Sequence, residues 1–161
     1  MKIKSEEVEW APKPNKVDLY MSSNCPQEDL VTSAFGIIWH GDKICLIEHM
    51  FRGMEIPGGH REKDEFVIET LEREIEEECG LGDLHEVQHI AYQKISLMGE
   101  KPAKYAYPYP VSYQCFYVAK AKTVLPFHPN LDSIKRIFLT IPELKQTPVY
   151  AKFKELFDLV L

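Results

Sequence analysis

One segment, residues 64–81, constrains the fold more than any other, because its pattern fits an amphipathic helix. Asp64 can cap the first turn, and Gly80 can supply the left-handed residue that ends a helix. Apolar residues recur at helical spacing and predict one buried stripe, formed by Ile68, Leu71, Ile75 and Cys79.

A second face of this helix carries three carboxylates, at Glu74, Glu77 and Glu78. Each like-charged pair at this spacing destabilises an isolated helix by about 0.2–0.5 kcal/mol, and the last turns of a helix favour cations instead. Only Arg73 is near enough in sequence to compensate. A pattern that opposes folding indicates a functional site. Carboxylate oxygens are ligands of Mg²⁺, although a solvated acidic face is the alternative.

The remaining pattern predicts one mixed α/β domain over residues 1–161, a length that suits a single domain. Residues 1–33 are polar and are expected to form an irregular segment with at most a short strand. A proline-punctuated loop follows the central strands, and a helix is expected after Pro142. Strand patterns lie at 34–40, 43–49, 84–97, 111–121 and 134–140.

Composition narrows the class of protein. No apolar run reaches the length of a membrane span, and the N-terminal residues lack a signal-peptide core, so we expect a cytoplasmic protein with no membrane partner. The four cysteines form no CxxC pair, which argues against a zinc or dithiol site, and Cys45 and Cys115 are interpreted as buried hydrophobes. The net charge of −6 argues against stable nucleic-acid binding.

Residues 59–81 read GHREKDEFVIETLEREIEEECGL and resemble the Nudix box at every specified position. The preceding Ile56-Pro57-Gly58 resembles the family's approach to the box. The motif covers about a seventh of the chain, and its many fixed positions make a chance match very rare. The order of strands and helices also resembles the Nudix α/β/α sandwich with a mixed β-sheet.

The resemblance implies a metal-dependent hydrolase that cleaves a nucleoside diphosphate linked to another group. It implies metal ligands at Glu74, Glu77 and Glu78 and at the backbone carbonyl of Gly58. The expected ion is Mg²⁺, with Mn²⁺ as an alternative, and the expected partner is a small nucleotide. The pattern leaves a homodimer open.

Two further roles follow by position in the motif. Arg73 matches the arginine that orients the glutamates, and Glu65 matches the glutamate that pairs with it. Family members differ in whether the general base lies in the box or on a downstream loop. Asp132 is the downstream candidate, with a plain loop acid as the alternative.

The segment EHMFRGMEIPGG at 48–59 resembles MutT-type nucleoside triphosphate pyrophosphohydrolases. It favours hydrolysis of a nucleoside triphosphate, oxidised nucleotides included, to monophosphate and pyrophosphate. RNA 5′-pyrophosphohydrolase and nucleotide-sugar or ADP-ribose pyrophosphatase are the alternatives. Arg52 could bind a substrate phosphate, and Glu55 could join the metal shell or only pair with Arg52.

The flanking aromatic and imidazole groups are less specific. His49 and His60 are interpreted as polar loop histidines. Tyrosines at 105, 107, 109 and 113 could stack on a base, although packing is the more common use of such a row. A Nudix-like isomerase or a non-catalytic nucleotide-binding module would be expected to carry a disturbed box, and this box is complete.

Overall fold

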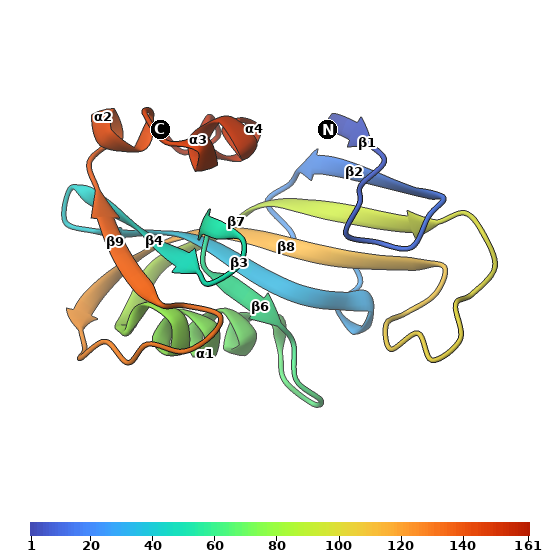
Figure 1. The fold of residues 1–161 in the computed structure, drawn as a ribbon, viewed down its shortest axis with the longest axis horizontal. Coiled ribbons are helices and arrows are strands. Elements are labelled where there is room, and N and C mark those ends of the chain that lie inside the picture. Colours follow the sequence, from blue (N-terminus) through green and yellow to red (C-terminus); the bar gives the residue numbers. More distant parts are fainter.

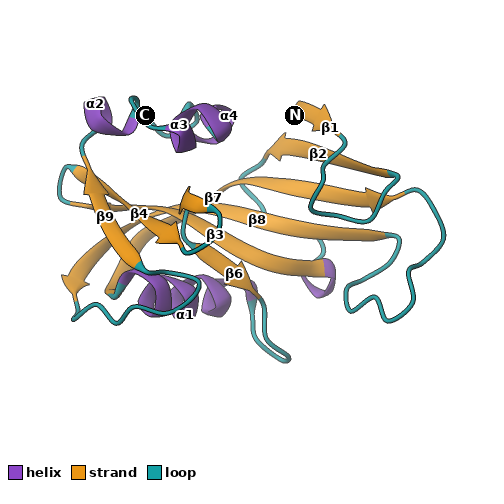
Figure 2. Cartoon of the chain, viewed as in Figure 1, coloured by secondary structure: helices purple, strands orange, loops and turns teal.

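The computed structural model describes all residues from 1 to 161 and shows a nine-stranded sheet with helices on both faces (Figures 1 and 2). The strands run in the order β1-β2-β7-β8-β3-β4-β5, while β6 pairs with β3 and β9 pairs with β4. The strands are β1 (Lys2–Glu6), β2 (Asn15–Met21), β3 (Val31–His40), β4 (Lys43–His49), β5 (Gly53–Glu55), β6 (Gly58–His60), β7 (Leu81–Leu97), β8 (Val111–Val124) and β9 (Lys135–Leu139). The helices are the 3₁₀ turn η1 (Glu28–Leu30), α1 (Val67–Cys79), α2 (Ile141–Leu144), α3 (Pro148–Lys152) and α4 (Lys154–Phe157).

Two hydrophobic layers sandwich the sheet. The layer below the sheet in Figure 1 packs α1, through Leu71 and Ile75, on β3, β4, β7 and β8. The layer above packs the C-terminal helices, through Leu144 and Phe157, on the opposite face. The sheet is mixed because β3 and β8 run parallel while the other pairs are antiparallel. The expected α/β/α sandwich is confirmed.

Each strand expected between residues 34 and 140 is present, and β3 and β4 form the expected hairpin. Residues 99–110 form no helix or strand, as their prolines predict. No helix combines the length and the apolar character needed to cross a membrane.

Residues 1–33 are not the irregular segment that was expected, because they contain a strand pair that extends the sheet. β1 pairs with β2, and β2 pairs with β7 along its full length. The buried Asn15 amide organises the connection, since it accepts from the Val8 N–H and donates to the carbonyls of Val8 and Ala11. β2 is short and carries Lys16 and Asp18, so its apolar alternation is weak in the sequence.

The start of α1 also differs from expectation. Asp64 adopts a positive φ of 63° in the preceding turn, and the helix begins at Val67. The Glu28 carboxylate accepts from the Val67 N–H at 2.8 Å, so the first turn is capped by a residue distant in sequence. Val67 is buried in place of the expected Ile68, which is 38% exposed.

The end of α1 forms as predicted, with Gly80 at φ 61° and Leu81 buried beyond it. The sequence did not predict that a cation contacts the C-terminal end of this helix. Arg136, from β9, donates to the carbonyls of Cys79 and Leu125, both at 2.9 Å. A positive charge at this end of a helix opposes its dipole, which offsets part of the cost of the acidic last turns.

The prediction of a single C-terminal helix after Pro142 is wrong, because the tail forms three short helices. Thr140 caps α2 and Thr147 caps α3 through their side-chain oxygens. Pro148 begins α3, and Phe153 separates α3 from α4 with φ −113°. These local stops interrupt the helix while Leu156 and Phe157 still reach the core.

Gly80→Ala is expected to destabilise the fold more than Gly41→Ala, although both positions have φ 61°. A Cβ at Gly41 meets nothing within 4 Å, so that variant reports only the left-handed backbone cost of about 1–2 kcal/mol. A Cβ at Gly80 would lie 3.0 Å from Arg136 Nη1 and 3.1 Å from the Pro126 carbonyl. Urea denaturation of both variants measures the difference, and equal losses would contradict the close approach.

Candidate functional site

The acidic face of α1 lies beside β6, the short strand that carries Gly58 and Gly59. A Cβ on Gly59 would come within 2.5 Å of Glu74 Oε1, so a larger residue would displace this carboxylate from its place beside the strand. Gly58 donates its N–H to Glu78 Oε2 at 2.9 Å. The structure therefore brings together the expected residues Gly58, Glu74 and Glu78.

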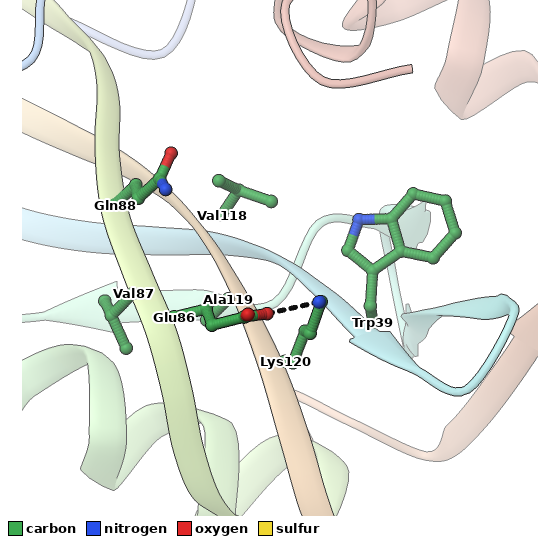
Figure 3. A pocket seen from close by; sticks show the side chains of 7 residues that line it. All are labelled: Trp39, Glu86, Val87, Gln88, Val118, Ala119 and Lys120. Carbon is green, nitrogen blue, oxygen red and sulfur yellow. Dashed lines mark ion pairs between the residues drawn. The ribbon is translucent and has the colours of Figure 1, made fainter.

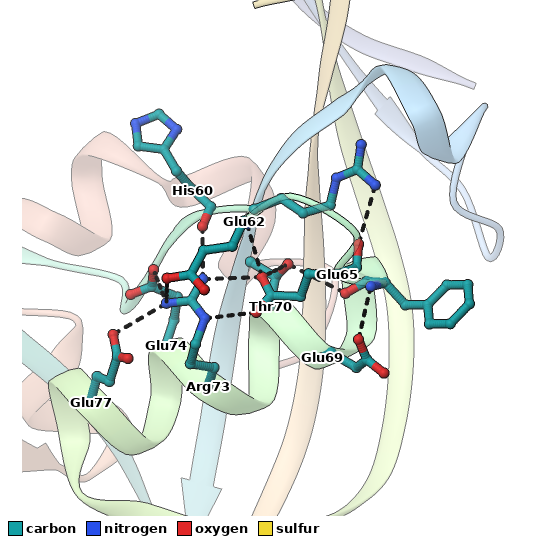
Figure 4. Close-up of polar contacts among 10 residues, drawn as sticks. His60, Glu62, Glu65, Glu69, Thr70, Arg73, Glu74 and Glu77 are labelled. Atoms are coloured by element: carbon teal, nitrogen blue, oxygen red, sulfur yellow. Dashed lines mark hydrogen bonds and ion pairs between the residues drawn. The ribbon is translucent and has the colours of Figure 1, made fainter.

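Arg73 is the centre of the polar network in Figure 4. Its guanidinium binds both oxygens of Glu65, at 2.7 and 3.1 Å, and donates to the His60 carbonyl at 2.8 Å. It also donates to Glu74 at 3.0 Å and to Glu77 at 3.2 Å. Arg73 thus ties the loop before the helix to the acidic face.

These contacts shift the pKa values of both Arg73 and Glu65. The hydrogen bond from Arg73 lowers the pKa of Glu65 to about 2, and the Thr70 hydroxyl adds to the effect. The same pairing raises the pKa of Arg73 above its ordinary value. Glu65 and Arg73 are therefore a fixed ion pair that holds the acidic face in place.

Glu78 is the opposite case, because no cation contacts its buried carboxylate. Its pKa is raised to about 8, first by burial and then by the charges of Glu74, Asp132 and Glu55, while the Gly58 N–H opposes the shift. Burial also raises the pKa of Glu74, although Arg73 opposes it. The two shifts thus arise first from burial, and the neighbouring negative charges add to them.

This donor set fits a hard divalent cation, since the buried Glu78 carboxylate has Glu74, Glu55 and Asp132 as its charged neighbours and no cationic contact. Glu77 lies at the outer edge, with its side chain 55% exposed and bound to Arg73. Gly58 lies at the same cluster, because its N–H donates to the Glu78 carboxylate.

Arg52 and Glu55 form a two-contact ion pair, at 2.7 and 3.2 Å. Of the two roles considered for Glu55, the pairing with Arg52 is therefore present. Glu55 also contributes to the raised pKa of Glu78, which places it near the acidic cluster.

The interpretation of His49 as a polar loop histidine is wrong, because this residue is buried at the end of a strand. Its Nδ1 accepts from the N–H groups of Phe51 and Arg52, so the neutral ring carries its proton on Nε2. That nitrogen lies 3.6 Å from Asp132 Oδ1. His49 thus joins the Arg52 loop to the Asp132 loop. The alternation Cys45, Ile47, His49 on β4 was the sequence signal for its burial.

The loop that carries Asp132 is anchored directly to the box helix. The Ser133 hydroxyl donates to the Glu78 carbonyl at 2.6 Å, and the Asn130 side chain accepts from the N–H groups of Asp132 and Ser133. Asp132 itself is exposed, with 75% of its side chain accessible. Ser133 was not singled out from the sequence, where no local pattern marks it.

The tyrosines divide between two roles. Tyr107 stacks on His60, with ring centroids 5.4 Å apart, while Tyr113 packs on Tyr92 within the sheet. A pocket of about 590 Å³ lies beside Tyr107 and the loop that leads into α1. Glu28, Arg61 and Phe66 contribute to its wall.

A separate pocket of about 410 Å³ lies over β3, β7 and β8 (Figure 3). It contains Trp39 and the ion pair between Glu86 and Lys120. None of the box residues lines it. The candidate functional site is therefore the acidic cluster, with the Tyr107 pocket next to the box loop.

Comparison with solved structures finds the same fold in several hydrolases. A mutant of the Bacillus subtilis pyrophosphohydrolase BsRppH superposes with TM-score 0.65 and 22% identity, covering 97% of both chains. The MutT hydrolase of Burkholderia pseudomallei gives TM-score 0.58 and 17% identity, over 80% of this chain and 96% of its own. A Caenorhabditis elegans Ap4A hydrolase gives 0.54 and 16%, over 78% and 91%.

Comparison with curated protein sequences finds no match. The family model described as NUDIX domain matches residues 30–159, which include the complete box and the loop of Asp132. Members of this family generally use divalent metal ions. The chain therefore belongs to the Nudix hydrolase family.

Proposed function

We propose that this protein hydrolyses a nucleoside triphosphate, oxidised nucleotides included, to the monophosphate and pyrophosphate, with Mg²⁺ as its ion and Mn²⁺ as a substitute. The observation that carries the proposal is the buried Glu78 carboxylate, which lies among Glu74, Glu55 and Asp132 without a cationic partner. An acidic protein needs a local cation to hold a polyanionic substrate, and this cluster would hold one.

Glu74, Glu77, Glu78 and the Gly58 carbonyl would hold the ion. When bound, a divalent ion lowers the pKa of water and neutralises charge on phosphoryl oxygens. Arg73 keeps the carboxylates in position through its contacts with Glu65, Glu74 and Glu77.

Substrate contacts and proton transfer fall to the residues around the cluster. Arg52 uses Nε and Nη2 to bind Glu55, which leaves Nη1 to contact a phosphate. A carboxylate oxygen of Glu78 or of Asp132 would accept the proton of the attacking water. The Tyr107 ring, stacked on His60, offers a surface for a base.

A second candidate is hydrolysis of 5′-triphosphate RNA ends, which present the same triphosphate group. The likeness to BsRppH favours it, because that superposition covers 97% of both chains, whereas the MutT hydrolase covers 80% of this chain. The net charge of −6 disfavours stable RNA binding. Nucleotide sugars and ADP-ribose are the remaining alternatives.

A substrate panel in the presence of Mg²⁺ tests the proposed function. We expect pyrophosphate release from nucleoside triphosphates, restored by Mn²⁺ and abolished by chelator, because the carboxylates would lose their ion. Matched reactions with triphosphorylated RNA, nucleotide sugars and ADP-ribose separate the alternatives. Full activity in chelator, or activity confined to another substrate class, would contradict the proposal.

Arg73→Ala is expected to lower turnover by about 10–100-fold, the range for partners that orient metal ligands. Arg73→Lys should recover little, because an ammonium group cannot bind Glu65 with two parallel contacts and also reach Glu74. Mg²⁺ titration of turnover should show weaker ion binding in both variants. Full activity with lysine would disprove the orienting role.

Glu78→Gln is expected to separate catalysis from stability. Turnover should fall by at least about 100-fold, because an ion ligand and a charge are lost. The metal-free variant should melt at or above the temperature of the parent protein, because a buried and uncompensated carboxylate has been removed. Glu76→Gln, on the exposed face of the same helix, is the matched control for both measurements. Lower melting with retained turnover would assign Glu78 a structural role.

A further inference from the structure

A second cluster of metal-binding side chains lies outside the box, at Cys25, His89 and Cys115. The three candidate ligand atoms lie within 4.8 Å of one another, and the two thiol sulfurs are 3.1 Å apart. The sequence argued against a thiol site because no CxxC pair exists. The fold nevertheless brings three distant residues together, since Cys25 follows β2, His89 lies on β7 and Cys115 lies on β8.

A β-bulge in β7 places His89 on the same face as Cys115. Tyr92 pairs with Cys115 and Ala91 pairs with Phe116, but the next partner, Tyr117, pairs with His89. Ile90 is therefore an extra residue, and it shifts the side-chain alternation by one position. Without the bulge, His89 would face away from the Tyr92 and Cys115 side of the sheet.

The hydrogen bonding of His89 leaves one ring nitrogen ready to bind a ligand. Nδ1 lies 2.8 Å from the Ser22 carbonyl, which can only accept, so Nδ1 carries the proton. Nε2 is buried and has no hydrogen-bond partner. Burial lowers the pKa of His89, which keeps the ring neutral and its Nε2 lone pair available. A carbonyl partner on the opposite nitrogen is also the usual arrangement of a metal-binding histidine.

We propose that Cys25, Cys115 and His89 bind a zinc-class divalent cation as a site distinct from the carboxylate cluster. Thiolate and imidazole ligands select such borderline ions rather than Mg²⁺. Binding replaces one proton on each thiol, so two thiolates balance the double positive charge and His89 loses no proton. Cys25 and His89 are partly exposed, so water can take a fourth position.

The spacing of the donors needs only a small adjustment. Two Zn–S bonds of about 2.3 Å at a tetrahedral angle separate the sulfurs by about 3.8 Å. The thiols at 3.1 Å would therefore move apart by less than 1 Å, within the reach of side-chain rotation. A disulfide would instead draw the sulfurs together and leave the buried His89 Nε2 without a partner. The unpartnered nitrogen favours the metal.

Such an ion would also hold the chain that caps the box helix. Cys25 lies three residues before Glu28, whose carboxylate accepts from the Val67 N–H at the start of α1. Binding would fix this segment to β7 and β8. We therefore expect zinc to raise the melting temperature of the protein.

Cobalt titration of the full-length, reduced and Mg²⁺-saturated protein tests the proposal, because excess Mg²⁺ occupies carboxylate sites. One equivalent of Co²⁺ should give a sulfur-to-cobalt charge-transfer band and the intense visible bands of tetrahedral cobalt, and one equivalent of Zn²⁺ should remove them. Cys25→Ser should lower the charge-transfer band by at least half, because at most one of the two thiolates remains. His89→Gln should weaken binding by more than about 10-fold, since a direct ligand is lost.

Cys45→Ala is the matched control, because Cys45 is a buried thiol of the same core layer but not of the cluster. It should bind cobalt as the parent protein does. Cys25 and His89 are partly exposed, so their variants remain informative if changes at the buried Cys115 prevent folding. Absence of the sulfur band in reduced protein, an unchanged band in Cys25→Ser, or formation of a Cys25–Cys115 disulfide without metal binding would overturn the proposal.

Discussion

The contact between the Gly58 N–H and the buried Glu78 carboxylate is the constraint on which the site depends. It requires β6 to approach α1 so closely that a Cβ on Gly59 would strike Glu74. It also places a negative group where water cannot solvate it well, which raises its pKa. The Asp132 loop is anchored to the same residue through Ser133 and the Glu78 carbonyl.

Positive charge is supplied around this contact but not at it. Arg73 binds Glu65, Glu74 and Glu77 along the outer side of the helix. Arg136 serves the carbonyls at the end of α1, where the helix dipole is negative. Glu78, the one buried acid of the box, has no cationic contact. The two arginines thus leave uncompensated the position where a divalent ion would bind.

The sheet links this site to the second cluster. His49, at the end of β4, connects the Arg52 and Asp132 loops. Glu28, in the connection between β2 and β3, caps α1. The bulge at Ile90 turns His89 toward the two thiols, and one of these, Cys25, lies three residues along the chain from that cap. The N-terminal segment therefore contributes both to the sheet and to the support of the box helix.

Local features of the fold could be predicted from the sequence. These are the strands with clear alternation, the helix that ends at Gly80, and the Arg73–Glu65 pair, whose members lie within one short motif. Contacts between distant segments set the start of α1, the burial of His49, the arrangement of residues 1–33 and the approach of Cys25 to Cys115. Periodicity reports which face of an element is buried. It does not report which distant element covers that face, because strand order, register and bulges set those contacts.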